Sequence, residues 1–188
     1  MARKSDKKDR LVHAAADLFW EKGFDATSLA DIAKSAGIPL GNVYYYFKTK
    51  VHIARAVADL FVTQSRELVH ELDRQAGSPA ERLDRFIDIL DTLTDARTRR
   101  GCPIARGAAD FKRHDPQAAA QSADALSVLT AWLETTLREA GRSGPEARAR
   151  QMITAWQGAI ALSHAYGSSD HLTATLAELR SAIRTRDR

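Results

Sequence analysis

Residues 27–50 constrain the fold most, because they place two short helical patterns on either side of a glycine. Ser28 is a favourable N-cap residue, and Asp31, three positions later, can complete a capping box. Apolar residues then follow at helical spacing up to Gly37, a residue suited to the left-handed conformation that ends many helices. Pro39 suits the first turn of a second helix, where its missing N–H costs no hydrogen bond. The segment therefore predicts a helix-turn-helix.

The second helix of this segment is expected to bury an apolar face and to expose aromatic as well as polar residues. Val43 and Phe47 lie four residues apart and form its buried face. The residues left facing outward are Leu40, Gly41, Asn42, Tyr45 and Tyr46, with Tyr44 at the boundary. A short helix with exposed polar and aromatic groups beside lysines is typical of an element that enters the DNA major groove. Spacing alone leaves another interpretation open, a corner of an all-α protein with a half-buried aromatic edge.

Together with the helical pattern before it, the segment resembles the DNA-binding domain of the TetR family of transcriptional regulators. The resemblance covers residues 11–56 and rests on a threonine, a hydrophobic helix, Ala-Gly-Ile, Val-Tyr-Tyr-Tyr-Phe and the lysines that follow. It implies a three-helix DNA-binding head. Residues matched to the family's phosphate contacts are Thr27, Ser28, Tyr44 and Lys50, with Lys48 assisting.

Residues 40–42, 45 and 46 would face the groove, and Asn42 is the best candidate for a hydrogen bond to a base edge. Two departures from the family pattern stand out. Leu40 replaces a residue that is often polar or basic, and Val51 and His52 stand where relatives usually carry acidic residues.

Composition agrees with a soluble, cytoplasmic DNA-binding protein. Of 188 residues 44% are hydrophobic and the net charge is +4, with nine Lys or Arg against six Asp or Glu in residues 1–50. The single cysteine excludes an intramolecular disulfide, and neither a membrane span nor a secretory signal is expected. Residues 1–6 are expected to be a basic arm on DNA or a solvated tail.

The remaining chain shows helical spacing and turn residues but no strand pattern. Helices are expected over residues 7–23, from a Thr49 cap to 72, and over 79–93, 103–112, 116–140, 146–166 and 170–185, with a loop at 95–103. The expected fold is all-α with about nine helices. Residues 1–49 would form the helix-turn-helix DNA-binding domain and residues 50–188 an effector-binding and dimerisation domain.

The resemblance further implies a small-molecule cavity in the body and a homodimer formed through the last two helices. Apolar stripes in these helices favour pairing, although they would serve equally well inside a monomer; they are Ala155, Ala159, Leu162, Ala165 and Tyr166, then Leu172, Leu176, Leu179 and Ile183. Candidate effector-binding residues are Phe61, Phe86, Leu90, Cys102, Phe111, Leu129, Trp132 and Trp156. Such residues are also common in plain cores. An apolar or aromatic effector is expected.

The sequence thus predicts a ligand-responsive transcriptional regulator, a repressor that a small molecule releases from a palindromic double-stranded DNA operator. Alternatives are regulation through a protein partner or through oxidation of Cys102, whose flanking arginines and Pro103 favour a thiolate. A buried, inert cysteine is the other interpretation of that residue. No metal or cofactor is expected, because no His, Cys, Asp or Glu set has ligand spacing, and no catalytic constellation supports an all-α enzyme.

Overall fold

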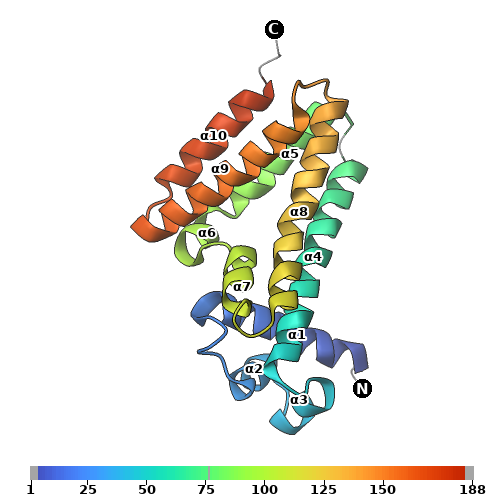
Figure 1. Ribbon diagram of the computed structural model, residues 1–188, viewed down its shortest axis with the longest axis vertical. Coiled ribbons are helices and arrows are strands. Elements are labelled where there is room, and N and C mark those ends of the chain that lie inside the picture. The colour runs from blue at the N-terminus through green and yellow to red at the C-terminus, as the bar shows by residue number, and fades with distance from the viewer. Residues whose placement is uncertain (1–3, 76, 185–188) are drawn as a thin grey trace. The chain divides into compact units, whose positions relative to one another are not determined.

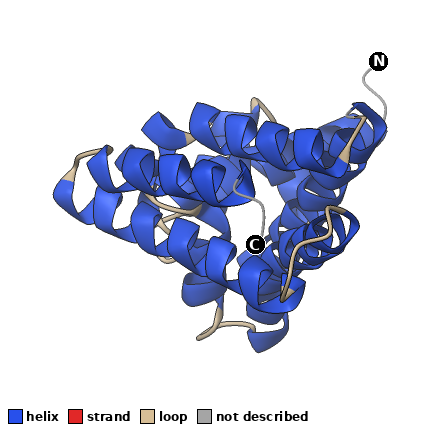
Figure 2. Cartoon of the chain, turned by 90° about the horizontal axis from the view of Figure 1, so that it is seen from above, coloured by secondary structure: helices blue, strands red, loops and turns tan. Residues whose placement is uncertain are grey.

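The computed structural model describes residues 4–75 and 77–184, and within these ranges every regular element is a helix (Figure 1, Figure 2). The helices in chain order are α1 (Lys4–Lys22), α2 (Leu29–Ala36), α3 (Leu40–Tyr46), α4 (Lys50–Gln75), α5 (Pro79–Thr92), α6 (Thr94–Arg100), α7 (Pro103–Phe111), α8 (Pro116–Glu139), α9 (Pro145–Tyr166) and α10 (Asp170–Arg184). The predicted all-α class is confirmed.

The chain divides into two compact units. The first consists of Met1–Gln64 and Pro103–Ala125, and the second of Ser65–Cys102 and Leu126–Arg188. The first unit therefore contains α7 and the first parts of α4 and α8 in addition to α1, α2 and α3. The predicted boundary at residue 49 separates DNA binding from effector binding, not one compact unit from another. That assignment of functions stays a prediction.

The first unit has a core in which α1 packs against α2 and α7, while α2 packs against α3. The rings of Phe19, Phe24 and Phe111 form a cluster, with centroids 5.2, 5.7 and 5.6 Å apart. Aromatic pairs of this kind add about 0.5–1.5 kcal/mol each beyond the burial of their surface. The cluster fixes α7 and the turn after α1 against α1.

The second unit has a core in which α9 packs against α10 and α6, and α10 also packs against α5. Phe86 and Trp132 lie with their ring centroids 5.4 Å apart, and the indole N–H of Trp132 donates to Asp73 at 2.8 Å. Where α9 meets α10, the buried Ser163 hydroxyl accepts a hydrogen bond from the backbone N–H of Leu172 at 3.0 Å. These bonds satisfy polar groups that burial would otherwise leave without water.

Cap residues explain why the helices begin where the sequence predicts. Ser78 accepts from the backbone N–H of Glu81 at 3.2 Å, and the Glu81 carboxylate accepts from the Ser78 N–H at 2.7 Å, so the predicted capping box is confirmed. The predicted Thr49 cap is also present, because the His52 N–H donates to its hydroxyl at 3.3 Å.

The prediction of a loop over residues 95–103 was wrong, because α6 occupies most of that segment. Electrostatics favours the helix although its residues lack an apolar stripe. Asp95 lies in the first turn, where the helix dipole favours a negative charge, and pairs with Arg99 at 2.6 Å. Arg97, Arg99 and Arg100 lie in the last turn, where a positive charge is favoured.

The predicted basic arm at residues 1–6 is partly corrected. Residues 4–6 belong to α1, which begins at Lys4 rather than at Lys7. Residues 1–3 lie outside the described residues.

Candidate nucleic-acid interface

The N-terminus of α2 carries the predicted capping box. The Ser28 hydroxyl accepts from the Asp31 N–H at 3.1 Å, and the Asp31 carboxylate accepts from the Ser28 N–H at 2.9 Å. Lys22 completes the arrangement, since its ammonium lies 3.0 Å from the same carboxylate. Hydrogen bonds from Ser28, followed by the Lys22 contact, hold the pKa of Asp31 far below its usual range. The cap fixes where α2 begins.

The corner between α2 and α3 is formed as predicted at Gly37. This residue has a φ of 63°, a left-handed conformation in which a side chain would be strained. The backbone N–H of Ile38 then donates to the Ala33 carbonyl at 2.9 Å, and the Arg10 guanidinium donates to the Ala36 carbonyl. Both bonds satisfy carbonyl groups at the end of α2. The angle between the two helices is therefore set by main-chain geometry.

α3 presents most of the residues that were predicted to face outward. Leu40 is 41% exposed and Tyr45 62% exposed, and Asn42 is also exposed. The order of the tyrosines was wrong: Tyr44, placed at the boundary, is 48% exposed, whereas Tyr46 is half-buried. Tyr46 follows the fully buried Val43 by three positions and so shares its face of the helix.

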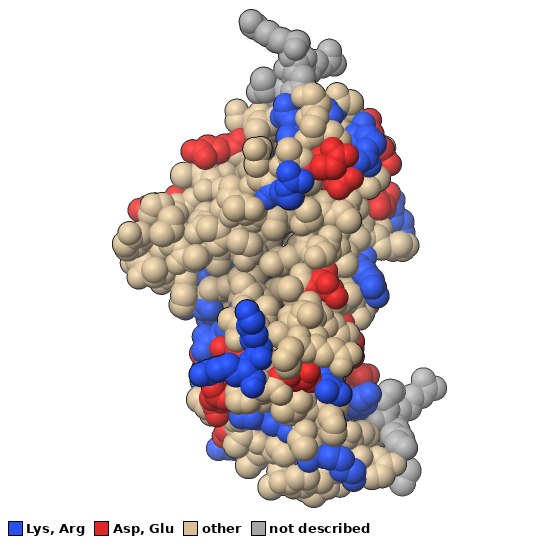
Figure 3. Space-filling model, in the orientation of Figure 1, with Lys and Arg blue, Asp and Glu red and all other residues tan. Residues whose placement is uncertain are grey.

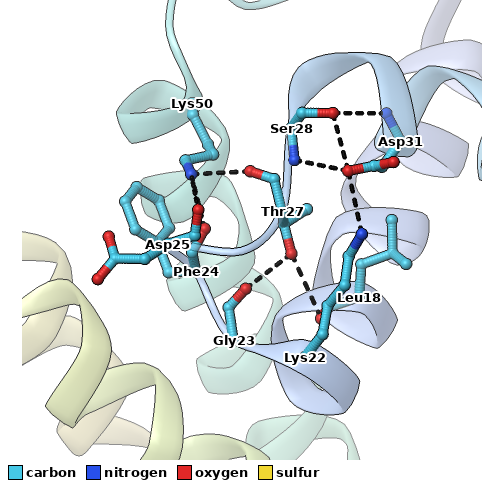
Figure 4. A network of polar contacts seen from close by, with 9 residues as sticks. All are labelled: Leu18, Lys22, Gly23, Phe24, Asp25, Thr27, Ser28, Asp31 and Lys50. Carbon is cyan, nitrogen blue, oxygen red and sulfur yellow. Dashed lines mark hydrogen bonds and ion pairs between the residues drawn. The ribbon is translucent and has the colours of Figure 1, made fainter.

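Thr27 was predicted to contact a phosphate, but in this structure its side chain has an internal partner (Figure 4). The residue is 1% exposed, and its hydroxyl donates to the Gly23 carbonyl at 2.7 Å. A hydroxyl group has one hydrogen to donate. In this conformation Thr27 therefore stabilises the turn after α1, and its contact with DNA stays a prediction.

Lys50 was likewise predicted to contact a phosphate, yet its ammonium donates to three backbone carbonyls (Figure 4). The acceptors belong to Phe24 at 2.6 Å, Thr27 at 2.7 Å and Asp25 at 3.3 Å. Its burial lowers the pKa of Lys50, an effect that the negative charge of Asp25 partly offsets. Sequence patterns did not reveal this arrangement, because the acceptors are main-chain atoms more than twenty residues away.

The turn after α1 is also held by the end of α7 and by the residues that follow it. Asp110 accepts from the Phe24 backbone N–H at 3.1 Å, while Arg113 and His114 contact the Asp25 carboxylate at 2.9 and 2.7 Å. The His114 ring additionally lies 4.7 Å from the Phe24 ring, centroid to centroid. His114 therefore contacts both a side chain and a ring of the turn that precedes α2.

The predicted effector-binding residues are all buried, but they are divided between the units. Phe61 and Phe111 belong to the first unit, where both lie against Gly107. The others belong to the second; they are Phe86, Leu90, Cys102, Leu129, Trp132 and Trp156.

One cavity of about 180 Å³ lies in the second unit between the end of α8, α9 and α10. None of the predicted effector residues lines it; its walls include Leu137, Met152, Leu179 and the charged side chains of Arg142 and Arg148. Trp156 Nε1 and Gln157 Nε2, which do not line this cavity, are buried donors with no hydrogen-bond partner among the described residues. The effector residues stay a prediction.

The last two helices differ in how they use their apolar stripes. On α10, Leu172, Leu176 and Ile183 are buried within the unit, so the alternative of burial inside the monomer holds for them. On α9, Leu162 is 45% exposed and Tyr166 70% exposed. Small residues exposed along α9 include Ala155, Gly158, Ala161 and Ala165. Figure 3 shows few charged side chains over α9 and α10 on the face that it draws.

Within the described ranges, no three His, Cys, Asp or Glu side chains come together as metal ligands would. Nor does any helix there combine the length and the apolar character needed to cross a membrane.

Comparison with known families gives two matches along the chain. Residues 11–57 match the model described as "Bacterial regulatory proteins, tetR family". Residues 79–178, more than half of the chain, match "Transcriptional regulator LmrA/YxaF-like, C-terminal domain".

Individual relatives match over shorter ranges. The HTH-type transcriptional regulator AcrR of Shigella flexneri is 33% identical over 109 residues, which are 53% of this chain and 50% of that protein. The HTH-type transcriptional repressor KstR2 of Mycolicibacterium smegmatis is 34% identical over 79 residues, 42% of this chain and 38% of that protein. The chain thus spans half or less of the length of these curated relatives.

The crystal structure of a TetR transcriptional regulator from Legionella pneumophila superposes with a TM-score of 0.84 over 98% of this chain and 99% of that one. At 21% identity this similarity concerns the fold alone.

Proposed function

Since this chain belongs to the TetR family of bacterial regulatory proteins, we propose that it is a transcriptional repressor that binds a palindromic operator and leaves it when a small effector binds. The observation that carries the DNA-binding part is the exposed face of α3, a two-turn helix whose position is fixed by the Gly37 corner and the Ser28 cap. An exposed helix on such a corner fits the major groove.

The residues of α3 and its surroundings divide the work of binding. Asn42 offers an amide that can hydrogen-bond to adenine, and Leu40 offers an apolar surface for a thymine methyl group. Lys48, exposed just after α3, is suited to a phosphate, as is the exposed hydroxyl of Tyr44. Phosphate contacts give affinity, and the contacts of Asn42 and Leu40 give sequence preference.

A homodimer is the second part of the proposal. α9 buries Met152, Trp156 and Ile160 inside its unit and still exposes Leu162 and Tyr166 on its other side. A helix that is apolar on both sides favours burial on both. A second copy that covers this face would give a two-fold dimer with two α3 helices, as two half-sites require.

Effector binding is the third part. The unpartnered donors Trp156 Nε1 and Gln157 Nε2 favour an effector that combines an apolar body with a hydrogen-bond acceptor. Regulation through a protein partner or through oxidation of Cys102 remains as the alternative to a small molecule.

Selection of bound sequences from random double-stranded DNA tests the proposal directly. We expect the protein to enrich one inverted repeat with half-sites about 34–36 Å apart, or a multiple of that distance. Metabolites are then screened for release of the protein from that DNA. Failure to enrich any sequence would contradict operator binding, whereas enrichment without release by any metabolite would favour a protein partner or oxidation.

A further inference from the structure

We propose that Lys50 is a positioning residue in DNA binding. Its ammonium holds the α1–α2 turn, residues 23–27, and so fixes the start of α2, instead of contacting a DNA phosphate. The proposal rests on the operator binding proposed above and changes the role that its family motif implies for this lysine.

The hydrogen bonds of Lys50 leave no donor for a phosphate. A lysine ammonium has three N–H groups and no acceptor. Three carbonyl oxygens, those of Phe24, Asp25 and Thr27, lie 2.6, 3.3 and 2.7 Å from Nζ (Figure 4). A phosphate contact in this conformation would have to displace at least one of them.

The surroundings of the ammonium hold it in place. Nζ lies 4.3 Å from the centroid of the Phe24 ring, a cation–π contact. That ring is 2% exposed and packs against Phe19 and Phe111, so it offers a fixed surface. The Asp25 carboxylate favours the charged form of Lys50. Moving the ammonium to solvent would break the three hydrogen bonds and the ring contact together.

The held turn leads directly into the DNA-binding helices. The carbonyl of Thr27, which accepts from Lys50, belongs to the peptide that joins Thr27 to the N-cap residue Ser28. The Thr27 side chain is bonded to Gly23 on the same turn. Because α2 begins at this cap and packs against α3, the position of the turn determines where α3 lies. Lys50 therefore acts through the main chain.

Salt dependence separates a positioning residue from a phosphate contact. The test uses the operator selected above and compares Lys50→Met with the matched variant Lys48→Met, which changes an exposed lysine two positions away. For Lys48→Met we expect the slope of log Kobs against log salt to lessen by about 0.9, the loss of one phosphate contact. For Lys50→Met we expect affinity to fall about tenfold or more at every salt concentration with the slope unchanged. A slope reduced by about 0.9 in Lys50→Met would overturn the proposal.

Lys50→Arg adds a second test. A planar guanidinium binds phosphate well but does not match three convergent carbonyls, so we expect arginine not to restore affinity. Full recovery of affinity by arginine would count against the proposed role.

A measurement on the unmodified protein decides the question if the Lys50 variants do not fold. In the free protein, NMR signals of the Lys50 ammonium should show slower hydrogen exchange than those of Lys48. In the operator complex, a coupling across a hydrogen bond to DNA phosphorus should appear for Lys48 and not for Lys50. Such a coupling at Lys50, or fast exchange of its ammonium in the free protein, would refute the proposal. If the wild-type protein bound no operator but its Lys50 ammonium still exchanged slowly, the proposed operator binding would be wrong and the contacts of Lys50 would stand.

Discussion

Asp115 connects two helices of the first unit, because one oxygen of its carboxylate caps α8 while the other accepts from the Arg55 guanidinium of α4. The capping oxygen accepts from the backbone N–H groups of Gln117 and Ala118 at 3.1 and 3.3 Å. The Arg55 hydrogen bond is the main cause that lowers the pKa of Asp115, and the two backbone bonds add to it. This one side chain therefore sets both the start of α8 and its attachment to α4.

Replacement of Asp115 tests that double role. Asp115→Ala should lower the free energy of unfolding by about 1–2 kcal/mol, since it removes the cap and the partner of Arg55 together. Asp115→Asn keeps a capping oxygen and should cost less. Urea unfolding of both variants at neutral pH measures the difference, and equal losses would contradict a separate contribution from the capping oxygen.

The same pair predicts a dependence on pH. Because the folded pKa of Asp115 is lowered, its contribution is fully present above the unfolded value of about 3.9 and is lost as the pH falls through the folded value. The stability advantage of the wild type over Asp115→Asn should therefore shrink below about pH 4. An advantage that persists unchanged well below that pH would show that ionisation of Asp115 is not involved.

Asn42→Ala should relax sequence preference without altering the salt dependence. Loss of its amide should reduce discrimination at one operator base pair by about 1–3 kcal/mol and leave the other positions unchanged. Binding to a panel of single-base operator variants measures this, with Lys48→Ala as the control that weakens binding to every sequence alike. Equal loss across the whole panel for Asn42→Ala would argue against a base contact.

Ala165→Glu should separate the two copies of a dimer, because it places a charge on the apolar exposed face of α9. Sedimentation velocity at micromolar concentration should show a dimer for the wild type and a monomer for this variant. Ala80→Glu makes the same change at an exposed position in α5 and should remain dimeric. A wild-type monomer, or a dimer unaffected by Ala165→Glu, would exclude this face as the interface.

Cys102 should react slowly with thiol reagents in the native protein, since the residue is only 7% exposed. A chromogenic disulfide reagent should modify it rapidly only after denaturation. Operator affinity of Cys102→Ser should respond to peroxide as the wild type does. Fast native modification, together with a peroxide response that the serine variant lacks, would support regulation by oxidation.

Sequence predicted the helices well wherever caps and breaks are encoded by local residues. Ser78, Pro79 and Glu81 define the start of α5 by their side chains alone, and Gly37 defines the corner before α3. α6 was missed because it has no apolar spacing, which is the main signal in a sequence. The order of Tyr44 and Tyr46 was available from the sequence, because Tyr46 lies three positions after Val43, which was correctly predicted to be buried.

The sequence predicted which residues belong to the candidate site better than it predicted the hydrogen bonds that they form. Asn42 and Lys48 were placed correctly on the surface because their neighbours specify an amphipathic helix. The bonds of Lys50 and Thr27 could not be foreseen, since their acceptors are backbone carbonyls whose positions depend on the folded turn. Motif matching assigns a role by residue type. A lysine that donates hydrogen bonds to carbonyl groups cannot be distinguished in sequence from one that binds a phosphate.

The choice of acceptors at Lys50 has a consequence for how the chain can change. Every residue type carries a backbone carbonyl, so substitutions at positions 25 and 27 leave the oxygens that Lys50 contacts in place. Mutation of residue 25 or 27 therefore keeps the acceptor oxygen, whereas mutation of Lys50 removes the donor. Sequence drift in the turn need not be accompanied by a compensating change at position 50, and pairwise covariation would not reveal the contact.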